Sequence, residues 1–232
     1  MLFDRVESYS REAVSLSNEE MKEEEKWSSQ FRDWLSVQEE GDPAHDLQHI
    51  ERVVLNTRHL AKEEGLGLEI LLPAAWLHDC VHVAKDSLNR SKASVMAADR
   101  AVEYLEEVGY SAEYFEAIHH AIEAHSFSAG IETRTLEAQV LQDADRLDAL
   151  GAVGLSRCLM LGGYMGSELM SRVDPFCESR EPEDAKFAVD HLYRKLLKLE
   201  NTMKTTAGRA LAIERTDFLR AFLEQLRREV PS

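Results

Sequence analysis

The run Leu-Leu-Pro-Ala-Ala-Trp-Leu-His-Asp-Cys-Val (residues 71–81) decides the fold. It is almost unbroken in its apolar character, yet it carries one His-Asp pair, His78 and Asp79. A short apolar segment is typical of a core helix, in which Pro73 is tolerated only in the first turn. Burying an imidazole and a carboxylate there costs on the order of several kcal/mol unless a partner binds them. A divalent metal ion would be such a partner, because neutral His and ionised Asp are both good ligands.

The composition around this run favours helices over strands. The chain has 232 residues, of which 44% are hydrophobic and only 11 are Gly and 5 are Pro. We find no strand-like alternation bounded by hairpin turn signals, so an all-α fold is predicted. Residues 1–26 are polar and rich in Glu, and we interpret them as a peripheral N-terminal extension. Residues 27–232 are expected to form a single domain, a compact helical bundle.

The charge balance restricts the class of partner. The formal net charge is −16, which argues against binding to a nucleic-acid backbone or to an anionic membrane. Small phosphorylated substrates remain compatible, because a bound metal and a few local cations can invert the field in one pocket. The three cysteines are scattered, and neither a secretion signal nor a run of transmembrane length is found. A cytoplasmic protein with reduced thiols is therefore expected.

Helical periodicity predicts the elements around the central run. The first core helix is expected from Trp27, and Ser91 (or a close neighbour) and Ser111 are expected to cap two later helices. The helical pattern weakens after Gly162-Gly163, so a mobile segment is expected around residues 164–184. The other apolar stripes cover residues 50–61, 95–105, 115–122, 136–147, 188–203 and 211–226.

Further ligand types lie on the predicted inward faces. His49 lies beside the stripe that begins at Ile50, and Asp145 and Asp148 share a face at i, i+3 spacing. Asp143 is expected to point elsewhere, with Arg146 as a possible partner. Each residue also has an ordinary structural explanation: a lone inward His is commonly a hydrogen-bonded core residue, and acidic residues cap helices or form surface ion pairs. Their combination with the His-Asp pair favours a mixed nitrogen and oxygen metal site.

The order His49, then His78-Asp79, then Asp145 resembles the HD-domain superfamily of metal-dependent phosphohydrolases. The resemblance extends from about Trp27 to the C-terminus. Three longer strings resemble a small bacterial subgroup that includes manganese-dependent nucleoside triphosphate pyrophosphatases. They are His-Asp-Leu-Gln-His-Ile-Glu-Arg-Val (45–53), Glu-Ala-His-Ser-Phe-Ser (123–128) and Gln-Asp-Ala-Asp-Arg-Leu-Asp-Ala-Leu-Gly-Ala (142–152).

The resemblance implies that His49, His78, Asp79 and Asp145 hold one divalent ion. Mn²⁺ is the first expectation, with Mg²⁺ or Fe²⁺ as alternatives. Such an ion activates water for attack on a phosphoryl group, so a nucleoside triphosphate would give a monophosphate and pyrophosphate. Several relatives carry a Glu three residues after the doublet, where this chain has His82. His82 is therefore a candidate acid/base alongside Asp79, although the departure leaves the exact reaction open.

Weaker candidates for substrate contacts are His125, Lys85, Arg90, Lys195 and Lys198. Three other readings stay open. A 5′-nucleotidase or phosphodiesterase would use the same site, and a nucleotide-sensing module would keep the site without catalysis. An oxygenase with paired irons would need further ligands, for which His45, His82 and His125 are the nearby histidines.

Overall fold

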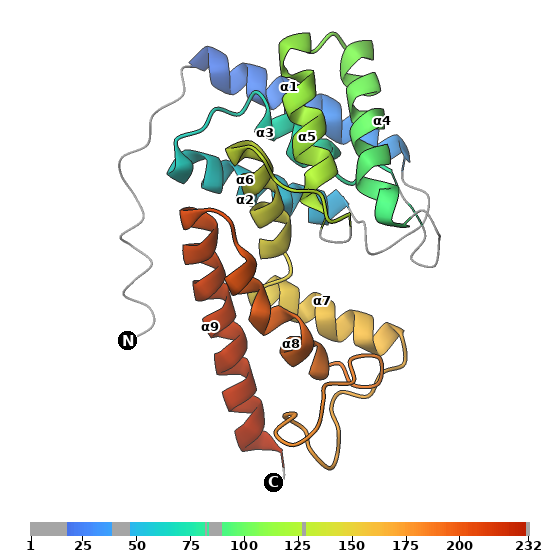
Figure 1. Cartoon of the computed structure of the whole chain (residues 1–232), viewed down its shortest axis with the longest axis vertical. Coiled ribbons are helices and arrows are strands. Elements are labelled where there is room, and N and C mark those ends of the chain that lie inside the picture. The colour runs from blue at the N-terminus through green and yellow to red at the C-terminus, as the bar shows by residue number, and fades with distance from the viewer. Residues whose placement is uncertain (1–17, 39–46, 82, 84–89, 127–128, 231–232) are drawn as a thin grey trace.

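The computed structural model describes residues 18–38, 47–81, 83, 90–126 and 129–230 (Figure 1). Within these ranges the regular elements are helices, and the one β-type contact is an isolated bridge between Glu168 and Phe187. The predicted all-α class is thus confirmed. The α-helices are α1 (Asn18–Gln38), α2 (Leu47–Glu64), α3 (Leu71–Leu77), α4 (Ala93–Glu107), α5 (Phe115–His125), α6 (Leu136–Leu147), α7 (Gly151–Tyr164), α8 (Asp190–Arg194) and α9 (Thr206–Glu229). Short 3₁₀ helices are η2 (Arg90–Lys92), η3 (Ala112–Tyr114) and η4 (Leu196–Thr202).

Helix α3 is the centre of the upper group of helices in Figure 1. It contacts α1, α2, α4, α5 and α6, and all seven of its residues are buried. Pro73 lies in the first turn, where its missing N–H leaves no intrahelical hydrogen bond unmade. The helix ends at Leu77, so the last four residues of the predicted run continue beyond it. His78 and Asp79 therefore stand at the end of the most enclosed helix of the chain.

Asp143 joins α6 to the start of α9. Its buried carboxylate accepts hydrogen bonds from the backbone N–H of Lys204 (2.9 Å) and of Thr205 (2.8 Å), and from the Thr205 hydroxyl (2.8 Å). The Thr205 hydroxyl also accepts from the backbone N–H of Gly208 and so caps α9. Asp143 points away from Asp145, as predicted. These hydrogen bonds come from the start of α9, while the expected Arg146 interacts with Asp143 through charge and donates to the Thr202 carbonyl at 2.6 Å.

Several element boundaries differ from the predicted ones. Helix α1 begins at Asn18, inside the predicted extension, because its exposed Glu-rich first half is made of strong helix formers. The stripe over residues 188–203 is two pieces, α8 and η4, separated at Lys195, whose backbone leaves the helical region (φ −131°, ψ −59°). Neither Ser91 nor Ser111 supplies a side-chain cap: Lys92 precedes α4, and the Ser111 hydroxyl donates to Glu113.

The segment expected to be mobile is held by hydrogen bonds. The Asp174 carboxylate accepts from the backbone N–H groups of Glu178, Ser179 and Arg180 at 2.8–3.1 Å. Arg180 forms a two-point ion pair with the buried Asp190 of α8 (2.5 and 2.8 Å). Specific polar contacts thus replace the missing apolar stripe at these residues, and the expected mobility stays a prediction.

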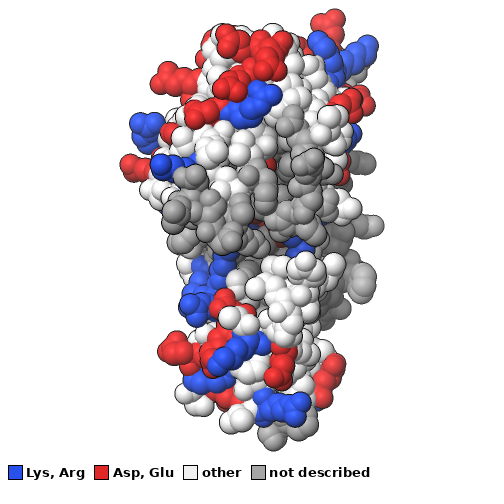
Figure 2. Space-filling model, turned by 90° about the vertical axis from the view of Figure 1, so that its right-hand side faces the viewer, with Lys and Arg blue, Asp and Glu red and all other residues white. Residues whose placement is uncertain are grey.

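The surface carries charges of both signs. Figure 2 shows Asp and Glu side chains interspersed with Lys and Arg side chains at both the upper and the lower end of this face. The described helices include none that is both long enough and apolar enough to cross a membrane.

Candidate metal centre

His78 presents a buried nitrogen that has no hydrogen-bond partner in the described part of the chain. The ring is fully buried, and its Nδ1 lies 2.8 Å from the carbonyl oxygen of Ala75, one turn earlier. A carbonyl only accepts, so Nδ1 carries the proton and Nε2 keeps its lone pair. Nε2 is buried and has no hydrogen-bond partner among the described residues. Such an atom costs stability unless it is bound, which is the situation of an imidazole that serves as a metal ligand.

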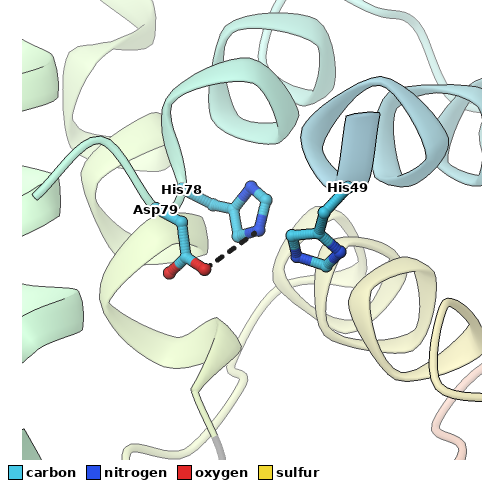
Figure 3. A group of neighbouring side chains, drawn as sticks. All are labelled: His49, His78 and Asp79. Atoms are coloured by element: carbon cyan, nitrogen blue, oxygen red, sulfur yellow. Dashed lines mark ion pairs between the residues drawn. The ribbon is translucent and has the colours of Figure 1, made fainter. Parts of the chain in front are cut away.

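His49 reaches the same place from α2 (Figure 3). Its ring centroid is 5.6 Å from that of His78, and its Nε2 is 3.5 Å from Oδ1 of Asp145 on α6. On the other side of the ring, Nδ1 lies 2.7 Å from Oδ2 of Asp148. Both imidazoles thus have Nδ1 engaged in a hydrogen bond and Nε2 turned toward the centre.

Asp79 completes the group. Its Oδ2 is 3.9 Å from Nε2 of His78, and the two side chains point toward each other in Figure 3. His49, His78 and Asp79 each offer a ligand atom within 4.8 Å of the others. Two neutral imidazole nitrogens with carboxylate oxygens suit a divalent transition metal, so the residues present fit such an ion.

His125 also joins this cluster. It is the last residue of α5, and its Nδ1 donates to the carbonyl of Ile122 at 2.6 Å. Its Nε2 lies 3.6 Å from Oδ1 of Asp79, and its ring meets that of His78 edge to face at 5.0 Å. The weaker sequence candidate is therefore within the immediate surroundings of the candidate ligands.

The three imidazoles have different proton affinities. Burial lowers the pKa of His78 to about 4, so this ring is neutral at ordinary pH. Burial also acts to lower the pKa of His49, but the hydrogen bond to Asp148 and the charges of Asp145 and Asp148 outweigh it and leave the pKa raised. The pKa of His125 is raised in the same way, through its interaction with Asp79.

Charged side chains flank the His49 imidazole on the side that faces away from His78 and Asp79. Asp148, which is 2% exposed, accepts from Arg52 of α2 at 2.6 Å and from Arg157 of α7. The sequence had indicated only that Asp148 shares a face with Asp145. Arg52 could have been noticed from its i, i+3 spacing to His49, but no sequence signal connects Arg157 with either residue.

Of the remaining predicted site residues, only Lys195 and Lys198 have side chains that the structure describes. His82 and Lys85 lie outside the described residues, and Arg90 is placed only as the first residue of η2. Lys195 and Lys198 are exposed where α8 meets η4, and none of their described contacts reaches His49, His78 or Asp79.

The fold and this centre define the class of protein: the chain belongs to the HD-domain superfamily. The HD domain model matches residues 46–150, which include His49, His78, Asp79 and Asp145. The particular relatives are bacterial. Uncharacterized protein YpgQ of Bacillus subtilis (strain 168) is 30% identical over 211 residues, which are 89% of this chain and 95% of YpgQ.

Two solved structures share the whole fold. The crystal structure of B. subtilis YpgQ in complex with ADP superposes with a TM-score of 0.70 at 30% identity, covering 90% of this chain and 97% of YpgQ. An HD-superfamily hydrolase from Bacillus thuringiensis gives a TM-score of 0.69 at 28% identity, covering 89% of this chain and 97% of its own.

Proposed function

We propose that this chain is a metal-dependent phosphohydrolase that acts on nucleotides. In this proposal His49, His78, Asp79 and Asp145 hold one divalent ion, Mn²⁺ in the first place and Mg²⁺ or Fe²⁺ as alternatives. The observation that carries it is the buried Nε2 of His78, which has no hydrogen-bond partner among the described residues and faces His49 and Asp79. The sharpest form of the reaction converts a nucleoside triphosphate to a monophosphate and pyrophosphate.

The ion, when bound, would lower the pKa of a water molecule and neutralise charge that develops on the phosphoryl oxygens. The protein's own contribution is positional. The Nδ1 hydrogen bonds of His49 and His78 fix both rings with Nε2 toward the centre. Asp79 lies between His78 and His125, so the two imidazoles define the direction of its carboxylate. His82 is proposed for proton transfer, because an ordinary imidazole titrates near neutral pH.

A nucleotide substrate is supported by the YpgQ structure with ADP. A polyphosphate tail needs cations, and the chain is strongly acidic overall. We therefore propose that Lys85, Arg90, Lys195 and Lys198 contact the phosphates, together with His125, whose raised pKa favours a protonated ring near neutral pH.

Product analysis tests the reaction. The purified full-length chain would be treated with a chelator, dialysed, reloaded with Mn²⁺, Mg²⁺ or Fe²⁺, and given panels of nucleoside triphosphates, diphosphates, monophosphates and phosphodiesters. Phosphorus NMR then separates pyrophosphate from free phosphate. Metal-dependent formation of monophosphate and pyrophosphate in equal amounts supports the proposal.

The other outcomes contradict the pyrophosphate-releasing reaction, and each indicates a different alternative. Release of free phosphate from monophosphates alone indicates a 5′-nucleotidase, and cleavage of phosphodiesters alone indicates a phosphodiesterase on the same site. Tight nucleotide binding without turnover under every metal condition indicates a sensing module. Two irons per chain by metal analysis would indicate the paired-iron oxygenase class.

A further inference from the structure

Asp148 is a buried carboxylate with an unusual set of donors. It follows the last residue of α6, and its side chain is 2% exposed. Oδ2 lies 2.7 Å from Nδ1 of His49 and accepts from Arg157, while Oδ1 accepts from Nε of Arg52 at 2.6 Å. One carboxylate thus receives hydrogen bonds from two different helices, α2 and α7.

These donors keep Asp148 ionised. Both carboxylate oxygens accept from guanidinium groups, Oδ1 from Arg52 and Oδ2 from Arg52 and Arg157, and these positively charged donors hold the side chain as a carboxylate. An ionised carboxylate can only accept hydrogen bonds. Nδ1 of His49 must therefore carry the proton, and Nε2 of the neutral ring has a lone pair.

His49 depends on this outside partner more than the other two histidines do. His78 and His125 stand at helix ends and donate to the carbonyl three residues earlier in their own helices. His49 lies in the first turn of α2, where the carbonyls accept from the N–H groups of the helix itself. Its tautomer and ring direction must be set by a side chain from elsewhere in the chain.

The end of α6 that carries Asp148 is itself held in place. Asn56 of α2 donates to the Ala144 carbonyl at 3.0 Å, and Arg215 of α9 donates to the Leu147 carbonyl at 2.7 Å. Arg215 also donates to Oδ1 of Asn56 at 2.8 Å. The last carbonyls of α6 are thus engaged by two other helices, which limits movement of the carboxylate.

We propose that Asp148 is a positioning residue for His49: held by Arg52 and Arg157, it fixes the Nδ1–H tautomer and turns Nε2 toward the candidate metal centre. The inference rests on the proposed metal site. Partners of this kind typically change metal affinity by about 10- to 100-fold when they are removed.

The test compares Asp148→Asn with Asp143→Asn in the full-length chain. Both residues are buried carboxylates of the same region that accept several hydrogen bonds, but only Asp148 contacts His49. The first measurement is the pair of ¹⁵N chemical shifts of the His49 ring in metal-free protein, at a pH above its raised pKa. The second is Mn²⁺ affinity by titration calorimetry.

We expect the wild type and Asp143→Asn to share the Nδ1–H tautomer and the same Mn²⁺ affinity. Asp148→Asn should show a mixture of tautomers, because an amide can donate as well as accept, and a Mn²⁺ affinity about 10- to 100-fold lower. Wild-type tautomer and affinity in Asp148→Asn overturn the inference. A wild type that binds none of the three metals overturns the proposed function instead, and the ¹⁵N shifts still decide the tautomer question.

Arg157→Gln provides a second route if Asp148→Asn does not fold. The Arg157 side chain is 39% exposed, so its replacement should leave the fold intact. We expect partial loss of the Nδ1–H tautomer and a fall in Mn²⁺ affinity of less than about tenfold. An unchanged tautomer and an unchanged Mn²⁺ affinity in this variant would show that Arg157 does not help Asp148 to position His49.

Discussion

At the scale of single residues, His78 has the most constrained chemistry in the molecule. Its Nδ1 donates a hydrogen bond to the carbonyl of Ala75, its Nε2 is buried without a hydrogen-bond partner among the described residues, and its pKa is lowered to about 4 by burial. The ring therefore offers a lone pair at neutral pH. A proton competes poorly for that position, whereas a metal ion gains both the nitrogen and the nearby carboxylates.

The pKa differences predict an order of titration in metal-free protein. His78 should remain neutral down to about pH 5, one unit above its pKa, while His49 and His125 should titrate above the ordinary value of 6.5. Histidine-resolved ¹H–¹⁵N spectra recorded across pH measure this. A midpoint for His78 near 6.5 would contradict the assignment.

The lowered pKa of His78 and the raised pKa values of His49 and His125 affect the free energy of unfolding in opposite directions as pH changes. Between about 4 and 6.5 the unfolded chain protonates His78 and the folded chain does not, so this contribution to the free energy of unfolding falls as pH falls. The raised pKa values of His49 and His125 stabilise the fold below 6.5, and that contribution is lost as pH rises through their folded pKa values.

Asp79→Ala should abolish metal-dependent activity while the fold persists. Removing a proposed metal ligand should lower activity by more than the roughly 100-fold that is the upper range for removing a residue that only contacts a ligand. The thermal unfolding temperature should change little, since relief of a partly buried charge offsets the lost contacts. Steady-state kinetics and thermal denaturation check both statements, with the exposed Asp217→Ala as the control. Activity that survives in Asp79→Ala would show that the proposed mechanism is wrong.

The candidate site could be predicted from the sequence to the extent that its residues disturb a local pattern. A His-Asp pair at the end of an apolar run, and His49, Asp145 and Asp148 on striped faces, are visible because they interrupt core periodicity. Arg157 does not interrupt any such pattern. Its contact with Asp148 depends on the start of α7, where Gly151 has φ +68°, and on the packing of α7.

At the scale of elements, helices with a clear apolar stripe were predicted and those without one were not. Helices α2, α4, α5 and α6 follow their stripes closely. Helix α7 was not predicted, because its sequence is apolar on nearly every side and contains four glycines, which hides a helical period. The first turns of α1 were missed for the opposite reason, since they are polar on every face.

The start of α9 gives an element-scale prediction. Thr205→Ala removes the hydroxyl that accepts from Gly208 and donates to Asp143. The free energy of unfolding should fall by about 1–2 kcal/mol, the usual value for a lost cap. Denaturant unfolding measures it, with Thr205→Ser as the rescuing variant and the exposed Thr206→Ala as the control. Equal stability in Thr205→Ala and Thr206→Ala would contradict the capping assignment. The affinity for Mn²⁺ should not change in any of the three variants.

At the scale of the whole molecule, the net charge of −16 opposes the approach of a nucleotide. Basic side chains that contact the nucleotide must therefore offset this repulsion at short range. Lys195 and Lys198 are exposed and close together in sequence, in a chain whose net charge is negative.

The double variant Lys195→Gln, Lys198→Gln should raise KM for a nucleoside triphosphate by about three- to tenfold, the range expected of exposed charge pairs. Because surface charges are screened, the difference from wild type should shrink as salt is added. The value of kcat should change little. Lys186→Gln is the matched control, since this exposed lysine pairs with Glu183. An unchanged KM at low salt would exclude the two lysines from substrate binding.

The Nδ1 groups of the three histidines have acceptors at different distances along the chain, and this has a consequence for how the chain folds. The rings of His78 and His125 acquire their direction as soon as their own helices end, because each donates to a carbonyl three residues away. The anchor of His49 lies 99 residues along the chain and requires α6 to have docked on α2. Long-range contacts of this kind form late. A partly folded chain would therefore present two oriented imidazoles, and capture of the metal would report completion of the fold.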